Sequence, residues 1–170
     1  MGVKQFYKPA GKAQVKRVFT DPWHFVAYGC GSGLSPVAPG TAGSVVGVIR
    51  AVACLPLPIY WAIGIVVVVT AVGVLVSDRV ARELDQKDPG GIVIDENAGQ
   101  MITLLLAPAH WPWWLLGFLW FRFFDVLKPW PASWCDRELP GGWGVMMDDI
   151  VAGIYGLIAL QLCIYGWQML

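Results

Sequence analysis

Charged side chains are scarce in this chain: Asp, Glu, Lys and Arg together make up 14% of its 170 residues, whereas hydrophobic residues make up 56%. The mean hydropathy is +0.57. This composition excludes an ordinary soluble domain and is typical of a polytopic membrane protein. The length suits one domain, which we expect at residues 21–170 after a basic segment at residues 1–20.

Other missing patterns exclude further classes of protein. The four cysteines show no C-x-x-C pairing, which argues against a zinc site or a disulfide framework and predicts packing roles (Cys30, Cys54, Cys135, Cys163). The formal net charge is zero and no basic face follows the first 17 residues, which argues against nucleic-acid binding. The basic N-terminal stretch lacks the apolar core of a signal peptide.

Two segments are long and apolar enough to cross a hydrocarbon core of ~30 Å. Ile59 to Val76 has 18 residues without a charge, and Ile150 to Leu170 has 21. The apolar segment Ala42 to Pro58 also carries Arg50. That residue must reach the membrane surface, face the bundle interior or mark a helix that does not fully cross.

A third uncharged stretch, Ala98 to Phe121, contains Pro108 and Pro112. Proline lacks an N–H group and restricts the residue before it, so two prolines four apart favour a turn between two short helices. We therefore predict a helical hairpin. It would return Asp125 to the side that holds Asp95 and Glu96.

Lysine and arginine placement agrees with the hairpin. Eleven of the twelve would then lie on one side, with only Arg50 inside a span, and the positive-inside rule makes that side cytoplasmic. Every acidic residue falls there too. The predicted fold is an all-α polytopic membrane helical bundle with a short helical hairpin and a cytoplasmic-face active site. The N-terminal lysines recur every four residues, which fits either a helix resting on anionic headgroups or a disordered basic tail.

Acidic residues gather from separate segments on that side. Asp95-Glu96 and Asp148-Asp149 would each open a helix, so helix capping and the helix dipole could account for either pair. Asp125 would lie near the end of a helix, where the dipole disfavours an anion, and a salt bridge with Arg122 or Lys128 could account for it. Neither explanation accounts for three acidic sites converging beside Arg and Lys.

Convergent carboxylates suit Mg²⁺, which prefers oxygen ligands and phosphate oxygens. Arg and Lys suit the phosphate itself, so the combination predicts phosphoryl chemistry on a membrane-borne substrate. The candidate metal ligands and catalytic residues are Asp95, Glu96, Asp125, Asp148 and Asp149, and the candidate phosphate ligands are Arg122 and Lys128. A glycine-rich segment with Gly40, Thr41, Gly43 and Ser44 could add backbone N–H donors at a helix start, although it lacks the P-loop Gly-Lys-Ser/Thr.

Covalent phosphatase mechanisms are disfavoured by the residues present. No cysteine is followed six positions later by arginine, and no Asp-x-Asp pair occurs. Of the two histidines, His110 would lie on the far-side turn, and His24, between two aromatic residues, suits packing or an interfacial position. Metal-assisted attack by water remains.

Four stretches resemble the bacterial phosphatidylglycerophosphatase A family: residues 31–44, Asp95 to Gly99, Phe121 to Pro131 and Gly141 to Gly153. The similarity runs in order from about Asp21 to the end. It implies a multi-pass enzyme of the bacterial inner membrane that requires Mg²⁺ and converts phosphatidylglycerophosphate to phosphatidylglycerol and inorganic phosphate. It also implies that the five carboxylates form the acidic site and that Arg122 and Lys128 bind phosphate. Ala42 departs from the larger residue expected in many members.

Three alternatives stay open. Another lipid phosphomonoesterase would use the same site. A lipid phosphotransferase would need a nucleotide or a second alcohol, and the Asp-Gly-x-x-Ala-Arg type of motif is missing. A small ion transporter would gather carboxylates near the bilayer midplane instead of at span ends. The sequence leaves the oligomeric state undetermined.

Overall fold

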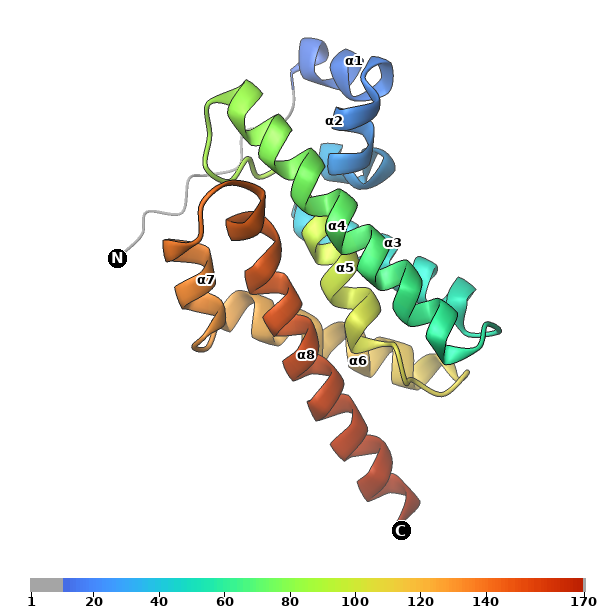
Figure 1. The fold of residues 1–170 in the computed structure, drawn as a ribbon. Helices are drawn as coiled ribbons and strands as arrows, with labels where there is room; N and C mark the ends of the chain where they lie inside the picture. The colour runs from blue at the N-terminus through green and yellow to red at the C-terminus, as the bar shows by residue number, and fades with distance from the viewer. Residues whose placement is uncertain (1–10, 170) are drawn as a thin grey trace.

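The computed structural model describes residues 11–169, and over this range the protein consists of helices and connecting turns with no strand (Figure 1). Lys4 and Lys8 lie outside the described residues. The main helices are α3 (Pro39–Cys54), α4 (Ile59–Leu84), α5 (Ile94–Thr103), α6 (Trp111–Leu127) and α8 (Gly141–Gln168). The shorter ones are α1 (Lys12–Thr20), α2 (Pro22–Ala27), the 3₁₀ segment η1 (Gly29–Leu34) and α7 (Ala132–Glu138). The all-α prediction is confirmed.

Two of these helices, α4 and α8, are long and apolar enough to cross a membrane. The prediction that Asp148-Asp149 open the last helix is wrong, because α8 begins seven residues before Asp148, at Gly141. The charge-free window ended at the aspartate pair, yet the helix continues through it. At its start, the Gly142 N–H donates to Asp78 Oδ1 of α4 at 3.3 Å.

This earlier start removes one explanation for the aspartate pair. Asp148 and Asp149 lie two turns inside α8 and are buried. Helix capping requires a position at the helix start, so it does not account for them.

α3 is shorter than a full span. Its 16 residues extend ~24 Å at 1.5 Å per residue, less than a ~30 Å hydrocarbon core. Of the three possibilities for Arg50, a helix that does not fully cross agrees with this length. The Arg50 guanidinium lies 3.2 Å from Cys30 Sγ of η1.

The predicted hairpin is present as a helix, a turn and a second helix. α5 ends at Thr103, Pro108 lies in the turn, and Pro112 lies in the first turn of α6. α6 therefore returns to the end of the bundle where α5 begins. Figure 1 shows α7, the start of α8 and the end of α4 at this same end, together with α1 and α2.

Glycine contacts hold α5 between its neighbours. A Cβ atom at Gly47 of α3 would lie 2.7 Å from Gln100 Cβ, and one at Gly153 of α8 would lie 2.5 Å from the Gly99 carbonyl oxygen. The Thr103 hydroxyl donates to the Gly153 carbonyl at 3.1 Å. Such close backbone approach is typical of helices packed through small residues in membranes. It fixes α5 between α3 and α8.

Candidate active site

Three carboxylates meet where the first turn of α5 faces α8. Asp95, Glu96 and Asp149 each place a carboxylate oxygen within 4.8 Å of the others. Asp95 and Asp149 are 8% and 3% exposed. Like charges this close and this buried repel one another unless a cation or protons compensate them.

All five predicted carboxylates line one cavity of about 90 Å³, and Lys128 lines it as well. The hairpin thus brings Asp125 to Asp95 and Glu96, as predicted. Two more aspartates line the cavity that sequence reasoning missed, Asp88 in the α4–α5 loop and Asp136 in α7. Neither aspartate forms part of a recognisable sequence motif. The only signal in the sequence was their position in segments predicted to lie on the cytoplasmic side.

The two predicted phosphate ligands are already paired with acids. Arg122 forms an ion pair with Asp125, and its Nη1 donates to the Ser44 hydroxyl at 3.3 Å. Lys128 Nζ lies 2.5 Å from Asp148 Oδ2 and 3.4 Å from Asp136 Oδ1. The salt-bridge explanation of Asp125 therefore holds for Arg122, while Lys128 binds other aspartates.

Lys128 follows α6 in a short loop. Burial alone would lower its pKa, but the negative charges of Asp148 and Asp136 outweigh burial and raise the pKa above its usual range. The ammonium group therefore stays charged at neutral pH.

Both acids of α5 have raised pKa values. α5 itself has ten residues, too few to cross a membrane. Burial, followed by the neighbouring Glu96 charge, raises the pKa of Asp95 well above its usual range. Burial also raises the pKa of Glu96 to about 7. Glu96 as a residue is partly exposed, but its Oε2 atom is buried.

The same acids carry unsatisfied oxygens. Asp95 Oδ1 and Glu96 Oε2 are buried without a hydrogen-bond partner, and so is Asp148 Oδ1. The N-cap position of α5 is Val93, so neither acid caps the helix. Asp95 and Glu96 thus have buried carboxylate oxygens without hydrogen-bond partners in a group of acids whose oxygens lie within 4.8 Å of one another. Such a group suits a hard metal cation.

The glycine-rich segment forms the first turns of α3 and lies beside these acids. A Cβ atom at Gly40 would lie 2.3 Å from Glu96 Oε1 and 3.4 Å from Arg122 Nη1. Gly43 instead faces Val93, whose Cβ would lie 2.7 Å away from an added Cβ. Because α3 begins at Pro39, the N–H groups of Gly43 and Ser44 fall within the helical hydrogen-bond ladder. Gly40 and Thr41 keep N–H groups outside it.

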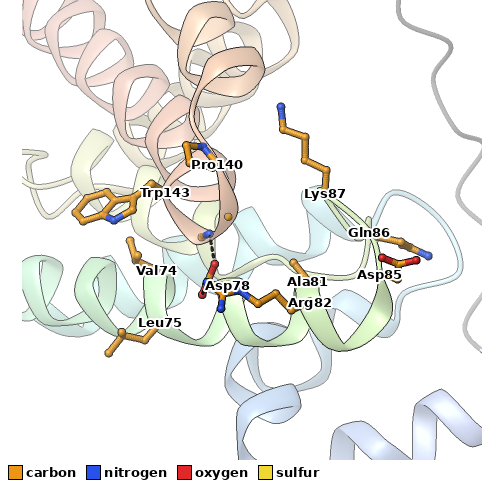
Figure 2. A pocket seen from close by; sticks show the side chains of 12 residues that line it. Val74, Leu75, Asp78, Ala81, Arg82, Asp85, Gln86, Lys87, Pro140 and Trp143 are labelled. Atoms are coloured by element: carbon orange, nitrogen blue, oxygen red, sulfur yellow. Dashed lines mark hydrogen bonds and ion pairs between the residues drawn. The ribbon is translucent and has the colours of Figure 1, made fainter.

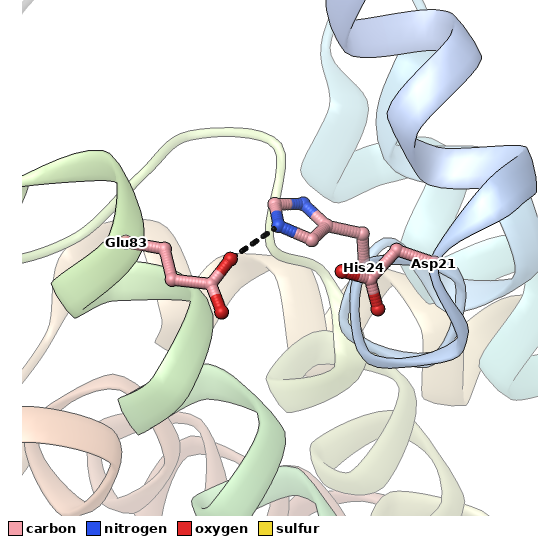
Figure 3. A group of neighbouring side chains, drawn as sticks. All are labelled: Asp21, His24 and Glu83. Atoms are coloured by element: carbon pink, nitrogen blue, oxygen red, sulfur yellow. Dashed lines mark hydrogen bonds and ion pairs between the residues drawn. The ribbon is translucent and has the colours of Figure 1, made fainter.

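The remaining candidates lie elsewhere. His110 is exposed in the α5–α6 turn, where it was expected. His24 is buried, and its Nε2 lies 3.2 Å from Glu83 Oε2, so packing is confirmed for it (Figure 3). Among the four free cysteines, Cys135 is buried and Cys54 and Cys163 are partly buried. The packing role predicted for Cys30 is wrong, because Cys30 is exposed.

Asp21, His24 and Glu83 also lie close enough together to hold a metal ion. Glu83, however, pairs with Arg17 and Arg79, whose positive charges disfavour a cation there. This group is an ion-pair cluster.

A larger cavity, of about 700 Å³, lies between the end of α4 and the start of α8 (Figure 2). Val74, Leu75 and Trp143 give it an apolar side, and Asp78, Arg82 and Lys87 are among its polar residues. None of the predicted site residues lines it. All five predicted carboxylates line the smaller acidic cavity instead.

The residues that line the acidic cavity lie within a segment that matches a known family. Residues 25–164 match the family described as Phosphatidylglycerophosphatase A, and all five carboxylates fall inside that range. The chain belongs to the phosphatidylglycerophosphatase A family. The resemblance predicted from the motifs is confirmed.

Two family members show the extent of the similarity. The Phosphatidylglycerophosphatase A of Escherichia coli K12 is 38% identical over 166 residues, which cover 96% of this chain and 94% of that protein. The Haemophilus influenzae protein of the same name is 38% identical over 154 residues, or 88% of this chain and 92% of its own length. A Bacteroides thetaiotaomicron protein, provisionally named a phosphatidylinositol-3-phosphatase, is 36% identical over 145 residues, or 81% of this chain and 90% of its own length. No solved structure matches the chain.

Proposed function

We propose that this protein is a membrane-bound lipid phosphatase that hydrolyses the terminal phosphate of phosphatidylglycerophosphate, releasing phosphatidylglycerol and inorganic phosphate. Membership of the phosphatidylglycerophosphatase A family supports this substrate and reaction. The observation that carries the proposal is the acidic cavity, where carboxylates from α5, α6 and α8 converge beside Arg122 and Lys128.

Asp95, Glu96 and Asp149 would hold Mg²⁺, because their oxygens lie within 4.8 Å of one another and two of these acids have buried oxygens without partners. When bound, the ion supplies a Lewis acid for a phosphoryl oxygen and lowers the pKa of water. The protein's own contribution is to fix these ligands on α5 and α8, whose backbones are in close contact.

Arg122 and Lys128 bind the phosphate in this scheme. Both are held at the site by carboxylates, Arg122 by Asp125 and Lys128 by Asp148. Phosphate oxygens would share or replace these partners, Arg through two N–H donors and Lys as a point charge. The N–H groups of Gly40 and Thr41 at the start of α3 supply further donors.

A carboxylate is also needed to accept the proton of the attacking water. Asp125 and Asp148 line the cavity without belonging to the close triad, so either is left for this role.

Exposed aromatic residues support a multi-pass position in the bilayer. One set lies at the end of the bundle opposite the site and another at the site end, as Trp and Tyr do at the two interfaces of a membrane. The first set comprises Tyr60, Trp61, Trp111, Tyr165 and Trp167, and the second comprises Trp23, Trp130, Trp134 and Trp143. Along α8, Trp143 and Tyr165 are ~33 Å apart at 1.5 Å per residue, close to the thickness of a hydrocarbon core.

From the distribution of Lys and Arg we infer that the site end faces the cytoplasm. Membership of this bacterial family supports a position in the inner membrane. The substrate's acyl chains would then stay in lipid while its headgroup reaches the cavity. A transporter reading is weaker, because the acids lie in the first third of α8, toward one end of the bundle.

Phosphate release tests the proposal. Purified protein is given phosphatidylglycerophosphate, phosphatidic acid and a phosphatidylinositol monophosphate in mixed micelles, with Mg²⁺ or with a chelator. We expect Mg²⁺-dependent release that is fastest from phosphatidylglycerophosphate. Release from none of the lipids would contradict a phosphatase, and faster release from another lipid would replace the substrate.

A further inference from the structure

We infer that α1 and α2 form a surface that binds anionic phospholipid headgroups at the site end of the bundle. We call it the N-terminal face: the exposed apolar residues Val15, Phe19, Trp23 and Phe25 together with Lys12 and Lys16. It lies outside the acidic cavity and goes beyond the phosphatase reaction.

α1 is two-sided. Toward the protein, Val18 is fully buried and Gln14 donates to the Tyr28 hydroxyl. On another side, Val15 and Phe19 lie one turn apart and are 37% and 63% exposed. Lys12 and Lys16, also one turn apart and exposed, lie next to that apolar side. An apolar stripe edged by lysines is the pattern of a helix that lies in a membrane surface.

An ion pair from Arg17 and a hydrogen-bond contact from His24 hold this face to the membrane-crossing helix α4. Arg17 of α1 and His24 of α2 both contact the Glu83 carboxylate of α4, and His24 Nε2 does so at 3.2 Å (Figure 3). Because Arg17 points to this acid, the lysines of α1 are left for the solvent or lipid side. α1 and α2, which carry the exposed aromatic side chains, are therefore held in place against α4.

The depth of the N-terminal face relative to the membrane follows from helix α4. Its outward side is apolar and exposed at Val68, Val72 and Leu75, and one turn later it carries Arg79. Such a change from apolar to charged marks the boundary of the hydrocarbon core. The Trp23 ring lies 4.7 Å from the Arg79 guanidinium, which puts α2 at this boundary.

The aromatics continue from that point. The Phe25 and Phe19 ring centroids lie 6.3 Å apart, so the two helices share one apolar patch. Trp23 and Phe25 are 40% and 37% exposed. The lysines lie beside an apolar patch at the membrane boundary, where their positive charge attracts anionic lipid headgroups. A lipid surface is therefore the partner that this face suits.

A pair of labelled positions tests this inference. In full-length protein lacking its four native cysteines, nitroxide labels are attached to Phe19→Cys or to Ala13→Cys, an exposed position about 120° away around α1. The protein is placed in vesicles of phosphatidylcholine, alone or mixed with phosphatidylserine, an anionic lipid that is not the reaction product. Relaxation by oxygen and by a water-soluble nickel chelate is then compared.

We expect the oxygen-to-nickel ratio to be several-fold higher at position 19 than at position 13, and to rise further with phosphatidylserine. Lys12→Gln combined with Lys16→Gln should remove that further rise. Equal ratios at the two positions would overturn the inference. So would shielding of position 19 from both reagents, since that would mean a protein partner or a second copy. The readout does not depend on phosphatase activity.

Discussion

Asp148 and Asp149 are neighbours in sequence with different partners. Successive residues of a helix point about 100° apart, so the two carboxylates face different parts of the cavity. Asp149 joins Asp95 and Glu96, whereas Asp148 contacts Lys128. Sequence reasoning placed both aspartates in one acidic site but could not tell their partners apart. Their partners depend on the position of Lys128, which is set by α6 and the loop that follows it.

Gly40 gives the sharpest residue-scale prediction. Gly40→Ala should reduce phosphate release by about 10- to 100-fold, because its Cβ would meet Glu96 Oε1 at 2.3 Å and displace a proposed metal ligand. The thermal unfolding temperature should stay near that of the unmodified protein, since the Glu96 carboxylate ends a flexible side chain that can swing away.

Two other glycines serve as controls for this variant. An added Cβ at Gly64 has nothing within 4 Å, so Gly64→Ala should leave both activity and unfolding unchanged or slightly raise stability. At Gly43 an added Cβ would meet Val93, so Gly43→Ala should lower the unfolding temperature. Equal phosphate release by the Gly40 and Gly64 variants would contradict the position assigned to Gly40.

At the scale of helices, the sequence predicted what proline and charge control directly. Pro108 and Pro112 located the turn between α5 and α6, and the charge-free run located α4. The start of α8 was missed because a polar pair was taken as a boundary, although tertiary packing buries it inside the helix. Asp88 and Asp136 were missed because they reach the cavity from a loop and a short helix whose positions no local pattern fixes.

The hairpin makes a topological prediction. Single cysteines replacing Asp88 and Glu138 should react with an impermeant reagent only from the cytoplasmic side, and one replacing His110 only from the outside. The reason is that α5 and α6 return the chain to the end where it started. A cysteine-free variant supplies the background signal. Labelling of positions 88 and 138 from opposite sides would refute the arrangement.

On the scale of the whole molecule, the two ends of the bundle are chemically different. Both carry exposed aromatic residues, but the acids, Arg122, Lys128 and the N-terminal face lie at one end. In the proposed function, this asymmetry would let a lipid substrate stay in the bilayer while its headgroup reaches the buried carboxylates. The sequence predicted the charged end from its Lys and Arg count, but the close packing of α5 against α3 and α8 is visible only in the fold.

The central claim is that the acidic cavity is a metal-dependent phosphatase site. Its most direct test is phosphate release from phosphatidylglycerophosphate, measured over a series of Mg²⁺ concentrations for the unmodified protein and for Asp95→Asn, Asp125→Asn and Asp149→Asn. Asn keeps the size of Asp but loses its charge. We predict release lowered by about 100-fold or more at low Mg²⁺, with partial recovery at high Mg²⁺ for Asp95→Asn and Asp149→Asn and a normal unfolding temperature throughout. Near-normal release by all three variants at low Mg²⁺ would contradict it.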